Sequence, residues 1–207
     1  MVLPRFRPML ASSGAIPGDA DDYAFEPKLD GWRSLVYVEP DRLTVRTRTG
    51  RDVTDALVGL DGLRGACGGS RVILDGELVA HRGTPDSFYR LGARMAARSP
   101  LAKAARVPVT FVAFDVLFRD GELIRSSYVE RRHVLESLHL QGPAWCTAPS
   151  FRGLGAELFA ACVELGLEGL MAKRLDGRYR PGERSSTWIK AKTVEWKTRH
   201  LPYRGDR

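Results

Sequence analysis

The amino-acid sequence predicts an α+β fold in which antiparallel sheets are flanked by helices. Several short segments alternate apolar and polar residues and end at Asp-Gly or Thr-Gly pairs, as strands joined by tight turns do. Other segments place apolar residues at helical spacing. The 207 residues contain no internal repeat, low-complexity tract or domain linker, which favours one domain with a sizeable core.

The first half of the chain is predicted to consist mainly of strands. Prolines at positions 4, 8 and 17 indicate an irregular arm before the first of them. The expected elements are the arm over residues 1–20, a strand–turn–strand unit over 23–38, a strand over 43–48, a helix over 54–66, and a strand over 71–81 that Asp75-Gly76 interrupts.

Helices and strands alternate in the second half. The expected elements are an amphipathic helix over 87–98, a buried strand over 107–118, a turn at Asp120-Gly121, helices over 130–140 and 156–165, and strands over 170–173 and 187–192. Gly166 follows the last helix directly, where glycine commonly ends a helix.

The charge balance restricts the class of partner. The formal net charge is +7 and the sequence pI is about 9.6. Arginine, which supplies much of the excess, binds phosphate through two parallel hydrogen bonds. A polyanion such as nucleic acid or a nucleoside triphosphate is therefore favoured. On charge alone, a solvated surface that serves solubility explains the excess equally well.

The cysteine content indicates a reducing compartment, and the hydropathy indicates that no segment spans a membrane. Cys67, Cys146 and Cys162 are too few and too scattered for a disulfide framework or a zinc cluster. No apolar run reaches the length of a membrane span, and no signal peptide is evident. We therefore expect a cytoplasmic protein without a membrane partner. The four histidines show no metal-ligand spacing.

One lysine stands out as a candidate nucleophile. Lys28 lies in the run Glu-Pro-Lys-Leu-Asp-Gly-Trp-Arg, between two predicted strands, so its amine can point into a cleft. A lysine amine attacks only in its neutral form, which desolvation and nearby cations favour. Asp-Gly pairs occur five times in the chain and usually mark turns. The pair after Lys28 gains significance from the flanking lysine and arginine.

Six segments in order resemble the motifs of the nucleotidyltransferase (adenylation) domain of ATP-dependent DNA ligases. They are Lys28-Leu29-Asp30-Gly31-Trp32-Arg33, Arg48-Thr49-Gly50, Leu74-Asp75-Gly76-Glu77, residues 111–115, Glu168-Gly169-Leu170-Met171-Ala172-Lys173, and residues 188–192. The residues around Lys28 and the segment Tyr-Arg-Pro-Gly at 179–182 most resemble those of bacterial ligases associated with end joining. The resemblance covers residues 23–192. It implies the ATP-grasp-like fold shared by DNA ligases and mRNA capping enzymes, with ATP as the cofactor and AMP carried covalently on Lys28.

Two further lysines are predicted to act with Lys28 in catalysis. Lys190 and Lys192 alternate on one strand, so both point to the same face. By the resemblance they contact the phosphates of the nucleotide, and their charge favours the neutral amine of Lys28. A solvated edge strand that carries two lysines is the alternative. Trp188 on the same face indicates a partly covered surface.

The resemblance also implies residues that hold the nucleotide and a metal ion. Glu168 resembles the ligand of a divalent cation, Mg²⁺ or Mn²⁺, and one carboxylate suffices because such ions keep waters and bind substrate phosphates. The alternative is a plain loop glutamate. Glu77 resembles the residue that holds the ribose hydroxyls, and Glu26 belongs to the nucleotide pocket.

One aromatic and two arginines complete the predicted site. Phe114 resembles the aromatic that stacks on adenine, and Phe111 replaces it if the register of the strand differs. Both are otherwise ordinary core residues. Arg33 and Arg48 are expected to face phosphate, either that of the nucleotide or the 5′-phosphate of a nicked strand.

The end of the sequence departs from the family pattern. Family ligases carry an oligonucleotide-binding (OB) barrel after the last of these motifs, whereas fifteen residues follow Lys192. We therefore expect an arm over 1–20, a nucleotidyltransferase domain over 21–193 and a basic tail over 194–207, with no OB domain. An excised catalytic domain, a stand-alone adenylating domain, and a component that works beside a separate barrel protein all fit this pattern. Only 27 residues precede Lys28, which disfavours the NAD-dependent ligases.

The sequence therefore predicts a monomeric ATP-dependent DNA ligase catalytic domain. It would form a lysine–AMP intermediate and transfer AMP to the 5′-phosphate of nicked duplex DNA, for repair or recombination. A separate OB-fold or end-joining protein is a possible partner. RNA ligation or GTP-dependent capping is the second enzymatic interpretation. A nucleic-acid-binding module that has lost turnover is the third.

Overall fold

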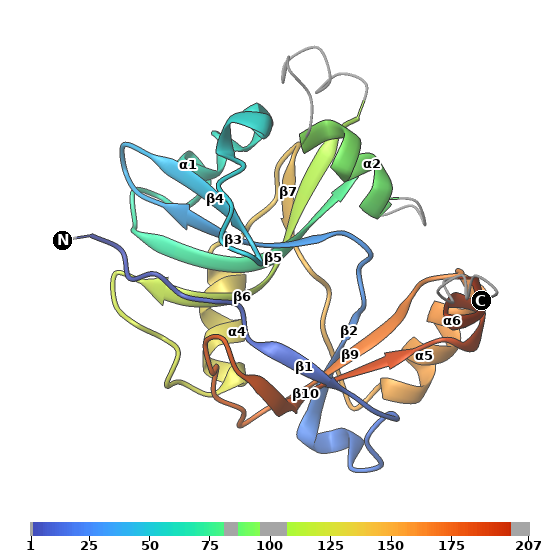
Figure 1. The fold of residues 1–207 in the computed structure, drawn as a ribbon. Helices are drawn as coiled ribbons and strands as arrows, with labels where there is room; N and C mark the ends of the chain where they lie inside the picture. The colour runs from blue at the N-terminus through green and yellow to red at the C-terminus, as the bar shows by residue number, and fades with distance from the viewer. Residues whose placement is uncertain (1, 81–86, 96–106, 200–207) are drawn as a thin grey trace.

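The computed structural model describes residues 2–80, 87–95 and 107–199. Two five-stranded sheets form the centre of the molecule, and helices pack against them (Figure 1). Most neighbouring strands are antiparallel, and parallel pairs occur at the sheet edges, between β1 and β10 and between β6 and β7. The α+β architecture predicted from the sequence is confirmed.

The strands of the two sheets come from different parts of the chain. Sheet A has the order β1-β10-β9-β2-β8, with bounds Leu10–Ser13, Arg184–Lys192, Gly169–Arg174, Tyr23–Pro27 and Phe151–Arg152. Sheet B has the order β4-β3-β5-β6-β7, with bounds Leu43–Thr47, Trp32–Val38, Val72–Ala80, Val109–Arg119 and Trp145–Thr147. Sheet B is thus continuous in sequence, whereas sheet A combines both ends of the described chain.

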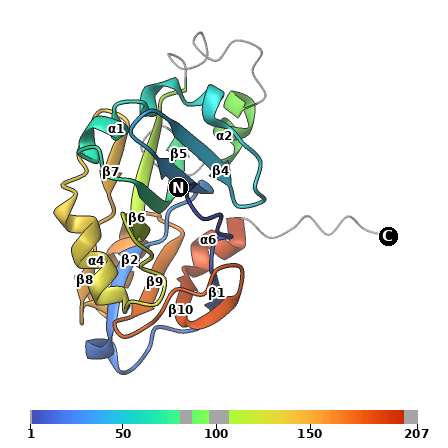
Figure 2. The same ribbon diagram turned by 90° about the vertical axis from the view of Figure 1, so that its left-hand side faces the viewer.

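Three helices pack against the central strands of the sheets. α2 and α4 pack against β5 and β6 of sheet B, and α5 packs against β2 and β9 of sheet A, as Figures 1 and 2 show from two sides. Within the described residues the α-helices are α1 (Leu63–Ala66), α2 (Ser87–Met95), α4 (Tyr128–Ser137), α5 (Gly155–Glu164) and α6 (Val194–Arg199). Three short 3₁₀ helices are η1 (Ala20–Asp22), η2 (Thr54–Ala56) and η3 (Val58–Leu60).

The capping residues explain where two of the helices begin and end. Ser127 precedes α4 and forms a reciprocal capping box with Glu130. Gly166 adopts φ +64° just after α5, as predicted for a residue that ends this helix. No described helix is long and apolar enough to cross a membrane.

Two segments differ from the sequence-based predictions. The arm was predicted to be irregular, yet β1 forms within it because its backbone pairs with β10. The predicted helix over 54–66 is divided into η2, η3 and α1. Asp75-Gly76 interrupts the regular pairing as predicted, since the register of β5 against β6 shifts between these two residues while the strand continues to Ala80. The part of the predicted helix 87–98 that follows Met95 lies outside the described residues.

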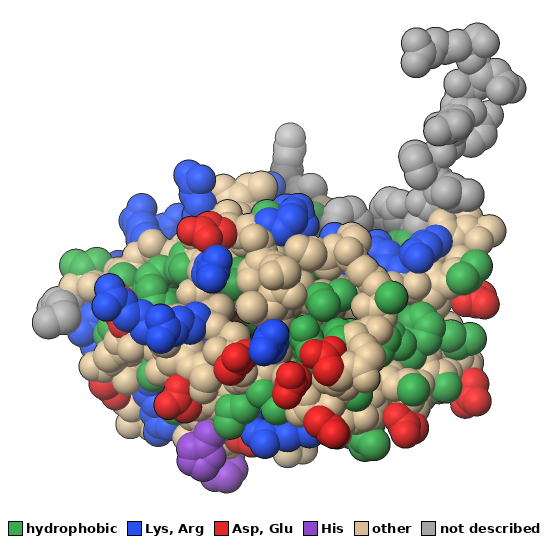
Figure 3. Space-filling view, turned by 90° about the horizontal axis from the view of Figure 1, so that it is seen from below, with side chains coloured by type: hydrophobic (Ala, Val, Ile, Leu, Met, Phe, Trp, Pro, Cys, Tyr) green, Lys and Arg blue, Asp and Glu red, His purple; other side chains and the backbone are tan. Residues whose placement is uncertain are grey.

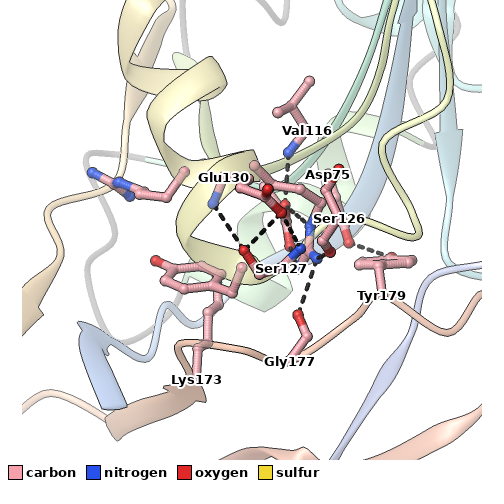
Figure 4. Close-up of polar contacts among 12 residues, drawn as sticks. Asp75, Val116, Ser126, Ser127, Glu130, Lys173, Gly177 and Tyr179 are labelled. Atoms are coloured by element: carbon pink, nitrogen blue, oxygen red, sulfur yellow. Dashed lines mark hydrogen bonds and ion pairs between the residues drawn. The ribbon is translucent and has the colours of Figure 1, made fainter. Parts of the chain in front are cut away.

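Buried polar side chains connect sheet B to the segment that joins β9 to β10 (Figure 4). The fully buried Arg131 of α4 donates two hydrogen bonds to Asp115 of β6, at 2.8 and 2.9 Å. The same guanidinium donates to the carbonyl oxygens of Ser126 and Gly177. This network satisfies polar groups that would otherwise be costly to bury.

Candidate active site

The candidate nucleophile lies where the chain passes from one sheet to the other. Residues 28–31 connect β2 of sheet A to β3 of sheet B. The Lys28 amide donates to the carbonyl oxygen of Gly169, which fixes the start of this connection. A Cβ atom on Gly31 would lie 2.1 Å from the Leu78 carbonyl oxygen, so only glycine fits there. The close approach gives a physical reason for the glycine of the Lys-x-Asp-Gly run.

Glu168 lies between two lysine ammonium groups. The distances from Lys28 Nζ to Glu168 Oε2 and from Lys192 Nζ to Glu168 Oε1 are both 2.7 Å. The Lys28 side chain is 21% exposed and that of Glu168 only 5%, so the contact is screened little by solvent. The structure thus brings together three residues that are 24 to 164 positions apart in the sequence.

Lys190 reaches the same region from β10. Its pKa is lowered by burial and by the nearby charges of Lys28, Arg184 and Lys192, while Glu168 opposes the shift. The predicted alternation therefore places Lys190 and Lys192 on one side of the strand, toward Lys28. A concentration of positive charge around one carboxylate is suited to binding phosphate groups.

A cavity of about 770 Å³ opens between the two sheets. Every residue predicted from the sequence to belong to the site lines this cavity: Glu26, Lys28, Arg33, Arg48, Glu77, Phe114, Glu168, Lys190 and Lys192. Phe111, the alternative to Phe114, is fully buried in the core of sheet B. The register of β6 therefore exposes Phe114 to the cavity. A cavity of this volume is of the size that holds small ligands.

Glu26 lies in the cavity wall within a buried charged cluster. Its carboxylate accepts a hydrogen bond from the Tyr128 hydroxyl at 2.6 Å and pairs with Lys173 Nζ at 2.7 Å. Lys173 also donates to the Phe114 carbonyl oxygen and lies 4.4 Å from the centre of the Trp188 ring. Burial lowers the pKa of Lys173, although Glu26 acts in the opposite direction.

Arg33 differs from the expected phosphate ligand. Its Nε and Nη2 atoms donate to the two carboxylate oxygens of Asp75, at 2.5 and 2.6 Å, and Nη2 also donates to the Met9 carbonyl oxygen. The guanidinium lies 4.6 Å from the centre of the Phe114 ring. Since Asp75 is fully buried, this pairing neutralises its charge. Arg33 therefore supports the wall that carries Phe114.

Arg48 fits the expected phosphate ligand better. Its side chain is exposed at the edge of the cavity, just after β4, and no carboxylate partner is recorded for it within the described residues. Its backbone amide donates to the carbonyl oxygen of Arg33. Thr47, Thr49 and Arg51 line the same edge.

The buried carboxyl group of Glu77 should make the stability of the protein depend on pH. Burial raises its pKa from 4.5 to about 8, although Arg33 and Lys28 act against the shift. Between these two values the folded protein binds more protons than the unfolded chain, so the free energy of unfolding falls as pH rises. Glu77→Gln abolishes this titration. We expect the variant to gain about 1–2 kcal/mol over the wild type between pH 5 and 8, a figure reduced because the carboxyl group faces the cavity.

The measurement is urea unfolding of both proteins at several pH values. Glu183→Gln, which changes an exposed glutamate outside the cavity, serves as the control and should follow the wild type. Parallel stability curves for Glu77→Gln and the wild type would show that Glu77 titrates normally.

The residues present can hold a divalent metal only together with a substrate. No group of three His, Cys, Asp or Glu side chains among the described residues is arranged to bind a metal. Glu168 offers two carboxylate oxygens, and each forms an ion pair with one lysine. A hard cation that retains several waters can use one carboxylate plus phosphate oxygens. Glu168 with a bound triphosphate therefore fits Mg²⁺ or Mn²⁺, which would neutralise developing phosphate charge.

Several residues of the site were not identified from the sequence. Trp188, Lys173 and Trp196 line the cavity, and Asp75 and Tyr128 support it. Their side chains meet partners far away in the sequence, as Lys173 meets Glu26 147 positions away, and no local pattern indicates such contacts. The local signal was Trp188, which the sequence placed on the face of the two lysines as a sign of a partly covered surface.

Together, the two sheets and the lysine at their crossover define a nucleotidyltransferase domain. The family model described as "ATP dependent DNA ligase domain" matches residues 8–192. The chain belongs to this family. The six motifs had predicted a DNA ligase adenylation domain, and the match to the family model confirms this prediction.

Curated relatives support the same assignment. The chain is 37% identical over 200 residues to the multifunctional non-homologous end joining protein LigD of Mycolicibacterium smegmatis, covering 95% of this chain and 24% of the relative. A probable DNA ligase of Streptomyces griseus is 36% identical over 203 residues, covering 91% of this chain and 40% of the relative. The chain thus spans about a quarter of the length of LigD.

Solved structures agree with the fold. The ligase domain of M. tuberculosis LigD has a TM-score of 0.75 and 37% identity, covering 90% of this chain and 59% of that one. A mycobacterial DNA ligase D complexed with ATP and MES has a TM-score of 0.76 with the same identity, covering 90% and 60%. The bacteriophage T7 ligase, at 18% identity and a TM-score of 0.65, shares the fold.

Proposed function

We propose that this domain transfers AMP from ATP to Lys28 and then to the 5′-phosphate of nicked duplex DNA. The observation that carries the proposal is the Lys28–Glu168–Lys192 arrangement in a cavity between the sheets. It supports covalent transfer because a nucleophilic amine, a cationic phosphate site and a single carboxylate lie within contact distance.

In the first step, the Lys28 amine attacks the α-phosphorus of ATP. A P–N bond forms, the P–O bond to pyrophosphate breaks, and the amine loses a proton. Glu168 holds the Lys28 Nζ atom in place, and Lys190 and Lys192 offset charge that develops on the phosphates. Phe114 provides a ring face for the base, and Glu26 offers a carboxylate acceptor at the same wall.

In the later steps, the nucleotide passes to the nucleic acid. A 5′-phosphate oxygen of the nick attacks the bound AMP, the P–N bond breaks and Lys28 regains its amine. The 3′-hydroxyl then attacks the activated phosphate, and AMP leaves. Arg48, exposed at the edge of the cavity, is suited to hold the 5′-phosphate. The name of the LigD relative states that it acts in non-homologous end joining. We propose that this chain acts in the same process.

The surface charge supports a nucleic-acid substrate. On the face shown in Figure 3, most lysine and arginine side chains lie on the left and hydrophobic side chains are denser on the right. The net charge of +7 is consistent with attraction to a phosphate backbone. A separate OB-fold or end-joining protein that helps to hold the nick remains part of the proposal, as does the cytoplasmic location.

The test is covalent labelling. With Mg²⁺ and α-labelled ATP, label should remain on the denatured protein, be released by acid, and be absent when Lys28 is replaced. A nicked duplex that already carries AMP on its 5′-phosphate is offered in parallel, and its sealing without ATP should be observed. Label from GTP instead of ATP would indicate capping chemistry. Neither label nor sealing would indicate a binding module.

A further inference from the structure

Three successive carbonyl groups around Glu168 are held by other parts of the chain. The Leu167 oxygen accepts from Thr193 Oγ1 at 3.2 Å, and the Glu168 oxygen accepts from the Thr193 amide at 3.0 Å. The Gly169 oxygen accepts from the Lys28 amide at 2.8 Å and from Cys162 Sγ at 3.2 Å. The backbone that carries the central carboxylate is therefore fixed from three directions.

Close packing on the far side restricts this segment further. Gly169 adopts φ +144°, and a Cβ atom there would lie 2.0 Å from the Ala191 carbonyl oxygen. The first residue of β9 thus lies directly against the end of β10. Only glycine permits this approach, so small changes in one strand are transmitted to the other.

Thr193 makes two of these contacts and also begins the next helix. It lies between β10 and α6 and is 2% exposed. Its hydroxyl accepts from the Trp196 amide at 3.3 Å, and its carbonyl oxygen accepts from the Lys197 amide, as at a helix N-cap. One buried side chain therefore joins the Glu168 segment to the first turn of α6.

The first turn of α6 reaches back to the active site. Trp196 lines the cavity, and its ring lies 4.9 Å from Lys192 Nζ, the same ammonium that pairs with Glu168. Such a contact between a cation and a ring face is attractive and restricts where the ammonium lies. Lys192 is thus held between the Glu168 carboxylate and an indole that Thr193 positions.

We propose that Thr193 is a positioning residue for AMP transfer. Its hydroxyl and amide lock residues 167–168, and its helix cap places Trp196 against Lys192, so that the Glu168 carboxylate stays between Lys28 and Lys192. Thr193 does not line the cavity and would not touch the substrate. This inference rests on the proposed function, because it assigns a role within that reaction.

The test compares Thr193→Val, which keeps the shape and removes the hydroxyl, with Thr193→Ser, which keeps the hydroxyl. At saturating ATP, Thr193→Val should form the Lys28 adduct about tenfold more slowly, since misplacing reacting groups by a fraction of an ångström is costly. Its KM for ATP should stay within about twofold of the wild type, because groups that bind the nucleotide are unchanged. Thr193→Ser should retain the wild-type rate.

Thr198→Val is a matched control. Thr198 lies on the same helix, is exposed, and donates its hydroxyl to the Val194 carbonyl oxygen without touching the cavity. It should leave the rate unchanged. A rate in Thr193→Val equal to the wild type, or a loss explained entirely by a smaller folded fraction, would overturn the positioning role.

A second measurement does not depend on activity. Hydrogen exchange should accelerate at residues 193–197 in Thr193→Val, where the Trp196 amide loses its acceptor, and remain slow in Thr193→Ser. Unchanged exchange would overturn the proposal even if the rate fell. If the wild type forms no adduct, the proposed function fails, and exchange alone decides whether Thr193 holds these segments.

Discussion

Lys28→Arg is expected to form no detectable nucleotide adduct. Arginine retains the positive charge and the reach toward Glu168, which accepts from Lys28 Nζ at 2.7 Å. The guanidinium stays protonated at any working pH and cannot attack phosphorus. Because the charge is preserved, loss of the adduct would reflect the missing nucleophile and not a collapsed site. Labelling with α-labelled ATP, followed by denaturing electrophoresis, measures the effect.

Two comparisons sharpen this result. Lys197→Arg makes the same replacement on an exposed residue outside the cavity and should label like the wild type. Lys28→Arg should also melt within a few degrees of the wild type, because the Glu168 partner keeps a cation. An adduct of normal yield on Lys28→Arg would place the nucleophile elsewhere and would end the proposed mechanism.

Arg131→Met is expected to cause the largest loss of stability. Arg131 and Asp115 are both 0% exposed, and the guanidinium also satisfies two backbone carbonyls. Methionine leaves the Asp115 carboxylate buried without a cation. Breaking a buried pair on one side costs about 3–5 kcal/mol, which for a domain of this size lowers Tm by about 10 °C. Urea unfolding and thermal melting measure the change.

A double variant separates the two parts of this cost. Asp115→Leu combined with Arg131→Met removes both charges, and apolar packing should restore about half or more of the lost stability. Arg132→Met on the same helix removes an ion pair with the exposed Glu136, a hydrogen bond to the Ala148 carbonyl oxygen and a 3.7 Å contact with Glu26. It should cost less, because Glu136 is solvated and Glu26 keeps Lys173 as a cation. Equal losses in the single and the double variant would show that the stability comes from the carbonyl contacts.

Much of the fold could be predicted because the strands have strong local patterns. The alternation over 43–48 and the Gly166 signal after α5 led to the correct elements. The β1 strand was missed, since Leu10–Ser13 carries no strand pattern and owes its conformation to pairing with β10. The helix predicted over 54–66 contains three glycines, which shorten it to isolated turns.

The site was predicted by residue type more fully than by contact. Periodicity correctly placed Lys190 and Lys192 on one face, and the register of β6 selected Phe114 over Phe111. Arg33 was expected to face phosphate, whereas its Nε and Nη2 atoms donate to Asp75. Nothing in the local sequence indicates this pairing, because Asp75 lies 42 positions away. The contacts of Glu26 with Tyr128 and Lys173 could not be predicted either, because these residues are also far apart in the sequence.

The division of strands between the sheets has a consequence for biosynthesis. Every strand of sheet B lies within residues 32–147, so that half can assemble while the polypeptide is still emerging from the ribosome. Sheet A must wait for residues 184–192, because this strand lies between β1 and the rest of the sheet and is the last of the described strands of sheet A to be synthesised. The early strands β1 and β2 therefore stay without these partners until those residues are synthesised, and the lysine between the two sheets acquires its surroundings only then.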